Sequence, residues 1–394
     1  MKFQICVNIR HGGGGICRLE ADIKFHDMPN PYPESTIYFE VDKANGYMLA
    51  DDSYDAFVLV PLWLAMLHNQ TLHIRGKISK RLYQNIKWYV QKILCDFYDA
   101  LSPVKIIVDG LTANDKCGKI VGAGISCGVD SLSTIYDHFI REDDPDYRIN
   151  ALFYFDCGVL GQFGVSEDKM RELNLNRCDI AKQVANEIGL PCYHLKSNVD
   201  KFRALEDLTK VGPFLRFSCA LSLGKALSRY YVSSDKTYNQ IKSFAKFFHN
   251  KLMTGFCESY LVPLIQTERT DLILDGCQYR RVDKLKKIVD WDIAQKYLNV
   301  CWRYTPDGSN CGRCLKCLRT LLPLEIMGKL DAYANVFDVE QYRKNSLSYK
   351  IRCLQNYGEE PFETELIDFA KENNFPMPQE VKGYVLGQQV IVMN

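Results

Sequence analysis

The chain has 394 residues, of which 47% are hydrophobic and 25% are charged, the balance of an ordinary globular protein and not of a disordered one. Its net charge of +1 supplies no overall positive field for RNA or DNA, so a nucleic-acid partner is not expected. The longest apolar run, residues 57–67, is too short to span a bilayer, and residues 1–10 alternate like a strand instead of forming a signal peptide. No membrane partner is therefore expected.

The 16 cysteines are many for a chain of this length. Most of them stand singly inside apolar runs, as Cys6, Cys95 and Cys219 do, and are expected to be small buried hydrophobes. This usage favours a reducing cytoplasm as the location, with cysteines available for a metal and not for disulfides.

Residues 1–115 predict a small N-terminal α/β domain. Strands are expected near residues 3–9, 17–25, 36–41 and 72–74, and helices near residues 54–68 and 79–98, with Ser79 as an N-cap. The glycine run at residues 12–15 is followed by no helical pattern, which favours a hairpin connection over a phosphate loop. No motif decides between packing, dimerisation and recognition for this domain, so a homodimer is left open.

The first chemical signature is a loop that reads Ser126-Cys127-Gly128-Val129-Asp130-Ser131. Apolar residues precede it, and helical spacing follows it from Leu132 to Ile140, so the layout is strand, tight loop, helix. The backbone N–H groups of such a turn, together with the helix dipole, attract an anion. The two serine hydroxyls can bind phosphate oxygens, and Asp130 can hold a magnesium ion. The alternative is a strand-to-helix turn in which Asp130 and Ser131 act only as caps.

Strand and helix patterns alternate after this loop, which predicts a doubly wound parallel sheet. Further strands are expected at residues 151–155, 192–195, 230–232 and 272–274, with helices at residues 173–188 and 215–227 between them. Ligands bind at the carboxyl ends of such strands, so Asp156 is a candidate for ribose or metal contact. Its alternative role is to cap the turn that follows its strand.

A basic segment, residues 279–287, begins a helix directly after the last predicted strand. Arg281 and Lys284 are three residues apart and share a face of that helix. They can reach a phosphate or a substrate carboxylate. A solvated helix face is the alternative interpretation.

The second signature is the cysteine set Cys301, Cys311, Cys314 and Cys317, with Gly312 allowing a tight turn. Four thiolates in this spacing predict a closed tetrahedral zinc site with a structural role, and an iron–sulfur cluster is the alternative. Arg313, Lys316 and Arg319 offset its negative charge. Beyond residue 330, helical patterns near residues 339–349 and 363–371 predict a helical C-terminal tail.

At its loop the chain resembles the PP-loop ATP pyrophosphatases, whose signature is Ser-Gly-Gly-x-Asp-Ser. Together with Phe155-Asp156-Cys157-Gly158 and the four-cysteine set, it resembles one branch of them, the 7-cyano-7-deazaguanine synthases. The resemblance covers roughly residues 119–325 and implies a nucleotide-binding domain at 116–300 of the adenine nucleotide alpha hydrolase-like kind. A zinc knuckle at 301–330 and a tail at 331–394 follow.

The chain departs from that family in several places. Cys127 stands where the family has glycine, Cys157 stands where it has tyrosine, and no glutamine follows Gly158. The family's Arg-Asn pair near the middle strand is not evident, and the N-terminal domain and the tail lie outside the resemblance. The chain therefore resembles a diverged, elongated relative, whose substrate does not follow from the family.

The resemblance implies an ATP-dependent, AMP-forming ligase or amidotransferase that adenylates a small carboxylate, of which a 7-deazaguanine acid is one example. Ammonia or an amine, including an amine of a protein, then displaces AMP. Residues 126–131 and Asp156 are expected to bind ATP with magnesium, and Asp130, Asp156, Arg281 and Lys284 are expected to act in the reaction. Two other functions stay open: sulfur transfer to RNA with Cys127 and Cys157 as a redox pair, and a nucleotide-binding scaffold without catalysis.

Overall fold

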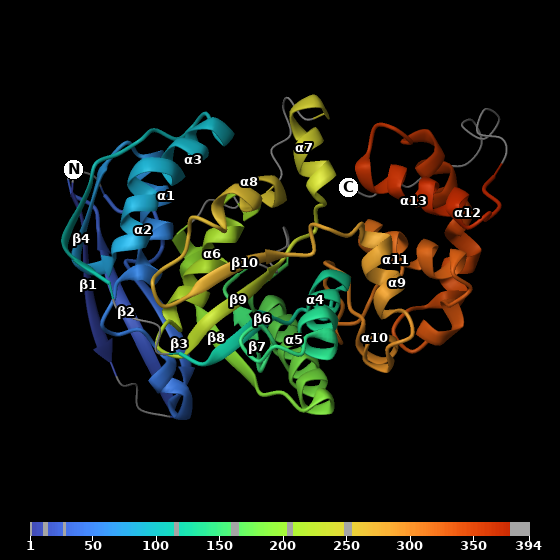
Figure 1. Cartoon of the computed structure of the whole chain (residues 1–394), viewed down its shortest axis with the longest axis horizontal. Coiled ribbons are helices and arrows are strands. Elements are labelled where there is room, and N and C mark those ends of the chain that lie inside the picture. Colours follow the sequence, from blue (N-terminus) through green and yellow to red (C-terminus); the bar gives the residue numbers. More distant parts are fainter. Residues whose placement is uncertain are drawn as a thin grey trace.

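A computed structural model describes residues 2–10, 15–26, 29–113, 118–158, 165–202, 208–247 and 254–378. The chain builds one sheet of ten strands in the order β10-β9-β6-β7-β8-β3-β2-β1-β4-β5. Helices lie on its two faces, which makes this an α/β protein, as the sequence predicts (Figure 1). None of the helices in the described ranges is both long enough and apolar enough to cross a membrane.

The five strands of one half of the sheet are all parallel, as the alternating pattern predicts. They are β6 (Ile120–Gly124), β7 (Ala151–Asp156), β8 (Cys192–Ser197), β9 (Leu227–Ser233) and β10 (Asp271–Asp275). The strand that carries the Ser126–Ser131 loop, β6, lies at the centre of this half between β7 and β9. Its carboxyl end is therefore flanked by two other strand ends.

The other half of the sheet comes from the N-terminal residues. Its strands are β1 (Lys2–Arg10), β2 (Ile16–Lys24), β3 (Thr36–Asp42), β4 (Thr71–Ser79) and β5 (Ile106–Thr112). β1 and β2 pair antiparallel, as a hairpin requires, although residues 12–14 of the glycine run lie outside the described residues. β3 pairs antiparallel with β8, where Phe39 faces Ser197. The two halves thus share one continuous sheet, whereas the sequence pattern indicates only a change of rhythm near residue 115.

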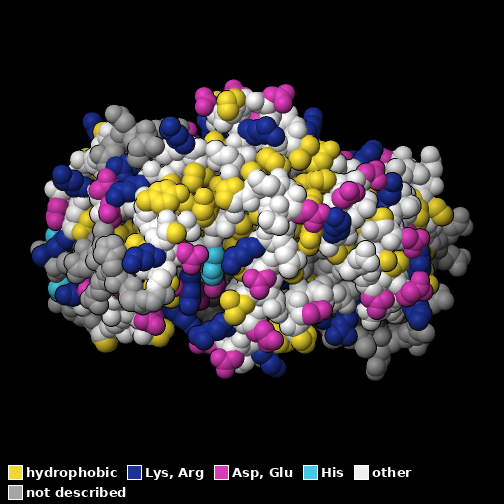
Figure 2. Space-filling view, turned by 90° about the horizontal axis from the view of Figure 1, so that it is seen from below, with side chains coloured by type: hydrophobic (Ala, Val, Ile, Leu, Met, Phe, Trp, Pro, Cys, Tyr) yellow, Lys and Arg dark blue, Asp and Glu magenta, His cyan; other side chains and the backbone are white. Residues whose placement is uncertain are grey.

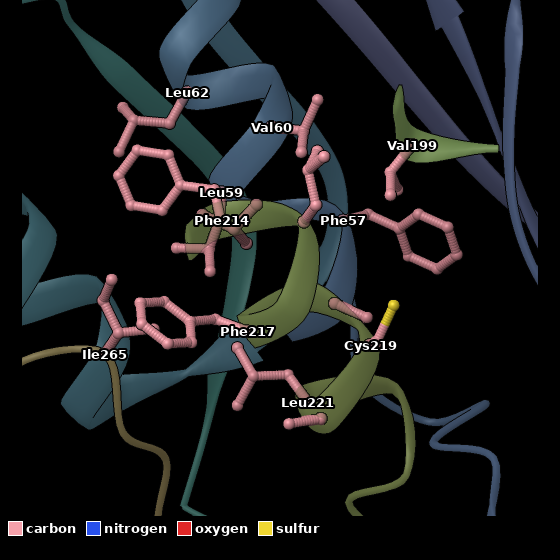
Figure 3. Packing of buried hydrophobic residues seen from close by; sticks show 14 of the residues in the cluster. Phe57, Leu59, Val60, Leu62, Val199, Phe214, Phe217, Cys219, Leu221 and Ile265 are labelled. Atoms are coloured by element: carbon pink, nitrogen blue, oxygen red, sulfur yellow. The ribbon is translucent and has the colours of Figure 1, made fainter. Parts of the chain in front are cut away.

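One face of the sheet is covered by helices from both halves. These are α1 (Leu59–Leu67), α2 (Lys80–Asn85), α3 (Gln91–Phe97), α6 (Leu208–Ser222) and α8 (Thr254–Leu261). Figure 3 shows how side chains of α1 and α6, among them Leu62, Phe214 and Phe217, meet in this core. Ser79 caps α2, since its hydroxyl accepts a hydrogen bond from Leu82 N at 3.0 Å. The predicted N-cap is confirmed.

The opposite face of the parallel half is covered by later helices. They are α4 (Val129–Ile135), α5 (Glu167–Ile188), α9 (Arg281–Ile288), α10 (Asp292–Tyr297) and α11 (Leu315–Ile326). The tail adds α12 (Val339–Gln355) and α13 (Pro361–Glu372), which pack on α9 and α11 through a small apolar cluster of their own. Figure 1 shows these red C-terminal helices at the end of the molecule opposite the blue N-terminal strands. A further helix, α7 (Tyr238–Phe247), follows β9.

The helix predicted at residues 215–227 has different bounds in the structure. α6 begins at Leu208 and ends at Ser222, and Leu227 already belongs to β9. The prediction was wrong at both ends. Residues 219–227 are mostly small or apolar, so the alternation of polar and apolar residues that would locate the end of a helix is missing there. In the structure that turn includes Gly224, whose N–H donates to Leu221 O at 3.2 Å.

Asp55 is a buried carboxyl that joins the segment before α1 to the start of α2. It accepts hydrogen bonds from Ser79 N at 2.7 Å and from the Ser53 hydroxyl, and burial raises its pKa to about 6. A pKa raised in the folded state adds stability at low pH that is lost as pH rises through the folded value. We expect the wild type to lose about 2 kcal/mol relative to Asp55→Asn between pH 4 and pH 7, measured by urea unfolding. A constant difference across that range would contradict this assignment.

Candidate functional site

The loop after β6 turns tightly and leads directly into α4. Gly128 is the N-cap of α4, and the Ser126 and Ser131 hydroxyls lie 3.1 Å apart across the loop. The Ser131 hydroxyl donates to Gly128 O at 3.2 Å, which fixes the loop from inside. Ser126 is exposed, so its hydroxyl and the first N–H groups of α4 are available to an anion in solution.

Cys127 occupies the sharpest point of this loop, with a left-handed backbone at φ 58°. Its thiol is 2% exposed and lies in the apolar cluster beneath the loop, where burial raises its pKa to about 12. The side chain therefore points away from the face on which phosphate would bind. Glycine takes this backbone conformation without strain, whereas cysteine gives up roughly 1 kcal/mol to adopt it.

Asp130, on the first turn of α4, accepts from two cations of α9. Arg281 Nη1 lies 2.7 Å from its Oδ2, and Lys284 Nζ lies 3.0 Å from its Oδ1. Burial raises the pKa of Asp130, but the positive charges of Lys284 and Arg281 lower it by a larger amount. The net pKa is therefore well below its ordinary value. The shared helix face predicted for Arg281 and Lys284 is present, and it binds the carboxylate of the loop itself.

Lys284 is held in place from its other side as well. Its side chain is 2% exposed, and its ammonium group also donates to Ser234 O after β9. Gly276, at φ 87°, leaves room for it, since a β-carbon there would lie 3.0 Å from Lys284 Nζ. The contacts with Asp130 and Ser234 O place the ammonium group of Lys284 at the carboxyl ends of the central strands.

Three more charged residues belong to this group, and the sequence interpretation did not include them as site residues. Asp235 and Lys236 follow β9 directly and pair at 2.8 Å, and Lys236 is 4% exposed. Lys316 comes from the first turn of α11 and is exposed, and its pKa is lowered by desolvation from the surrounding protein and by the charge of Arg281. The Asp235 side chain is 51% exposed. Desolvation raises its pKa, but Lys236 lowers it by more, with smaller effects from Asp130, which raises it, and Lys316, which lowers it.

These shifts link two ion-paired carboxylates near the carboxyl ends of β6, β9 and β10. Arg281 and Lys284 contact Asp130, Lys236 contacts Asp235, and the charge of Lys316 helps to lower the pKa of both carboxyls. Lys236 was detectable in the sequence, because it follows a predicted strand end, where ligands bind. Lys316 was not, because it lies between Cys314 and Cys317 of the cysteine set and comes near the site only through the fold.

Asp156 ends β7, the strand beside β6, as predicted. Burial raises its pKa, and the nearby charges of His194, Lys196 and Arg171 oppose that rise. Gly124 of β6 pairs with Phe153 of β7, and the two strands are parallel. Asp156 therefore lies further toward the carboxyl end of the sheet than Ser126, the first residue of the loop. Among the described residues its charged neighbours come from β8 and α5, and Arg281 and Lys284 are not among them.

The four predicted cysteines form a single cluster. All their sulfur atoms lie within 4.8 Å of one another, with Cys301–Cys314 at 3.8 Å, Cys314–Cys317 at 3.5 Å and Cys311–Cys317 at 4.0 Å. A tetrahedron with metal–sulfur bonds of 2.3 Å has edges of about 3.8 Å, so the sulfurs fit a zinc ion. Cys301 is brought to the others by Asn310, whose Oδ1 accepts from Val300 N at 2.9 Å and Cys301 N at 3.1 Å.

The cysteine cluster is joined to the loop by the segment that precedes it. Asn299 N donates to Cys127 O at 2.7 Å, two residues before Cys301. Arg177 of α5 donates to Cys301 O at 2.9 Å, and Cys314 is the N-cap of the helix that carries Lys316. A metal bound here would therefore hold both the underside of the loop and the start of the helix that carries Lys316.

Cys127 and Cys157 do not form a pair. Cys127 belongs to the apolar cluster beneath α4, and Cys157 belongs to the cluster on the other face of the sheet, where its thiol shares a hydrogen bond with the thiol of Cys219. The sheet therefore separates the two thiols that the sulfur-transfer alternative requires.

Comparisons with known protein families, with curated proteins and with solved structures give no match for this chain.

Proposed function

We propose that the protein is an ATP-dependent, AMP-forming ligase or amidotransferase that activates a small carboxylate for attack by a nitrogen nucleophile. The observation that supports this proposal is the contact of Arg281 and Lys284 with Asp130 in the Ser126–Ser131 loop, with Lys316 near enough for its charge to help lower the pKa of that carboxyl. Cations and a helix N-terminus at the carboxyl ends of parallel strands suit a polyphosphate. The resemblance of this loop to the PP-loop signature supports the same class.

In this proposal the loop and the cations hold the β- and γ-phosphates. The α-phosphorus then faces the acceptor, so a substrate carboxylate attacks there and pyrophosphate leaves with its charge offset by Arg281 and Lys284. No covalent protein intermediate is needed, since positioning and charge carry the reaction. Ammonia or an amine, including an amine of a protein, then displaces AMP from the acyl adenylate. A 7-deazaguanine acid is one candidate for the acid.

Magnesium fits the two carboxylates of the site. Asp130 and Asp235 are near enough for the charge of one to raise the pKa of the other, and each carboxylate oxygen has a second lone pair beyond its present bond. Magnesium in such sites is held by one or two carboxylates and by the phosphates themselves. Bound there, it offsets charge on the departing pyrophosphate. Asp156 remains a candidate on the substrate side, and zinc is the metal we assign to the cysteine cluster.

The sulfur-transfer alternative has less support, because Cys127 and Cys157 lie on opposite faces of the sheet. Figure 2 shows acidic and basic side chains interspersed on one face of the molecule, without a broad basic surface there for RNA. The proposal thus favours a small-molecule substrate.

The reaction class is tested by the nucleotide products. Purified protein with Mg-ATP, ammonium and a panel of carboxylates, deazapurine acids included, is expected to form AMP and pyrophosphate in equal amounts and only when an acid is present. The reason is that gripping the two terminal phosphates leaves the α-phosphorus exposed. Products are separated by ion-exchange chromatography. ADP as the product would overturn the assigned class, and tight ATP binding without turnover on any acid would favour the scaffold alternative.

A further inference from the structure

The C-terminal helix α13 holds the first turn of α9. Glu365 Oε1 accepts a hydrogen bond from Val282 N at 2.8 Å, and Glu365 is 8% exposed. Around this contact Val282 packs with Leu366, Ile367 and Phe369 in one apolar cluster. At the surface Arg280 Nη1 and Nη2 donate hydrogen bonds to the Glu372 carboxylate at 2.7 and 2.9 Å. The start of α9 is thus attached to α13 by a buried hydrogen bond inside an apolar layer.

The contact lies within one turn of the groups that face Asp130. Val282 stands between Arg281 and Lys284 on α9, and both of those side chains bind the Asp130 carboxylate. A short helix moves as a unit, so the position of the Val282 N–H sets where both cations stand. Leu285 and Ile288 also pack α9 against α4, but the backbone N–H of Val282 in its first turn is held by Glu365.

Stability alone does not explain a glutamate at this position. Burial raises the pKa of Glu365 to about 7, against the opposing charges of Arg281 and Arg280, while Asp283 adds to the rise. An apolar side chain would fill the same layer without that desolvation. An apolar side chain, however, cannot accept the hydrogen bond from the Val282 N–H. This N–H lies in the first turn of α9, where backbone N–H groups have no partner within the helix itself.

We propose that Glu365 is a positioning residue of the polyphosphate site, which aligns Arg281 and Lys284 by fixing the first turn of α9. This inference rests on the proposed function for its ligand and assigns the C-terminal tail a part in the site. The tail is then an element of nucleotide binding and not only a cover for α11.

The test compares three variants by calorimetric titration with Mg-ATP and with Mg-pyrophosphate. Glu365→Ala is expected to weaken both ligands about tenfold, because the acceptor for Val282 N is lost. Glu365→Gln keeps an acceptor oxygen and is expected to stay within about twofold of the wild type. Leu366→Ala is the matched control, since it loosens the same layer without removing the hydrogen bond. It is expected to lower the melting temperature as much as Glu365→Ala while leaving affinity unchanged.

A second measurement is independent of any ligand. Hydrogen exchange in the ligand-free protein is expected to rise in peptides covering residues 276–288 for Glu365→Ala and not for Leu366→Ala. Unchanged exchange there, or equal loss of affinity in both variants, would overturn the positioning role. A wild type that binds neither Mg-ATP nor pyrophosphate would instead overturn the proposed function, and the exchange result would still decide whether Glu365 restrains α9.

Discussion

Replacing Cys314 by serine is expected to leave the protein insoluble or largely unfolded. Structural zinc in small peptides contributes about 10–16 kcal/mol, which is comparable to or larger than the whole stability of about 5–15 kcal/mol of a typical folded protein. Cys314 is both a candidate ligand and the N-cap of α11, so its loss also releases the helix that carries Lys316. Purified wild type should contain about one zinc per chain by plasma emission spectrometry.

The matched control is Cys353→Ser. Cys353 is fully buried in the cluster between α12 and α13 and lies apart from the four cysteines of the metal cluster. It is expected to keep the full metal content and to lower the free energy of unfolding by about 1–3 kcal/mol. Iron with visible absorbance in the wild type would show that the four cysteines bind an iron–sulfur cluster and not zinc. Protein without any metal would contradict the site altogether.

Replacing Asp130 by asparagine is expected to weaken Mg-ATP binding roughly a hundredfold, or about 3 kcal/mol. The carboxylate aligns two cations, Arg281 at 2.7 Å and Lys284 at 3.0 Å, and in the proposed function it is also a magnesium ligand. Charge-assisted hydrogen bonds of this kind contribute about 1.5–3 kcal/mol each. Ser131→Ala is expected to act in the same direction with a smaller effect, because it removes one hydroxyl of the loop.

Asp137→Asn is the control for the loss of an ion pair on the same helical segment. Asp137 pairs with Lys287, and both side chains are 12% exposed, but neither reaches the loop. Its variant should lose stability without losing affinity. Titration in EDTA separates the two roles of Asp130. Without magnesium only the alignment of Arg281 and Lys284 is left, so Asp130→Asn should lose less ATP affinity relative to the wild type than it loses with Mg-ATP. Equal Mg-ATP affinity in Asp130→Asn and wild type would contradict the assignment of this site.

Several features of this protein are determined by short stretches of its sequence. The parallel strands follow from continuous apolar runs such as Ala151–Asp156, and the cap of α2 follows from Ser79 itself. The four-cysteine cluster follows from spacing, because Cys311, Cys314 and Cys317 lie within one tight turn and the start of a helix. The strand, loop and helix around Asp130 follow from a change of hydrophobic period. In each case the residues that interact are close in the chain.

Other features were decided only by the tertiary structure. The sheet continues from β8 into β3, although the paired residues Phe39 and Ser197 are far apart in the sequence, and no local pattern specifies that pairing. The partners of Asp130 and of Val282 come from α9 and α13, and Lys316 reaches the site through a helix that begins inside the cysteine cluster. Periodicity and spacing show which residues share a face of one element. Which faces meet depends on how all elements bury their apolar surface together, and that is a property of the whole chain.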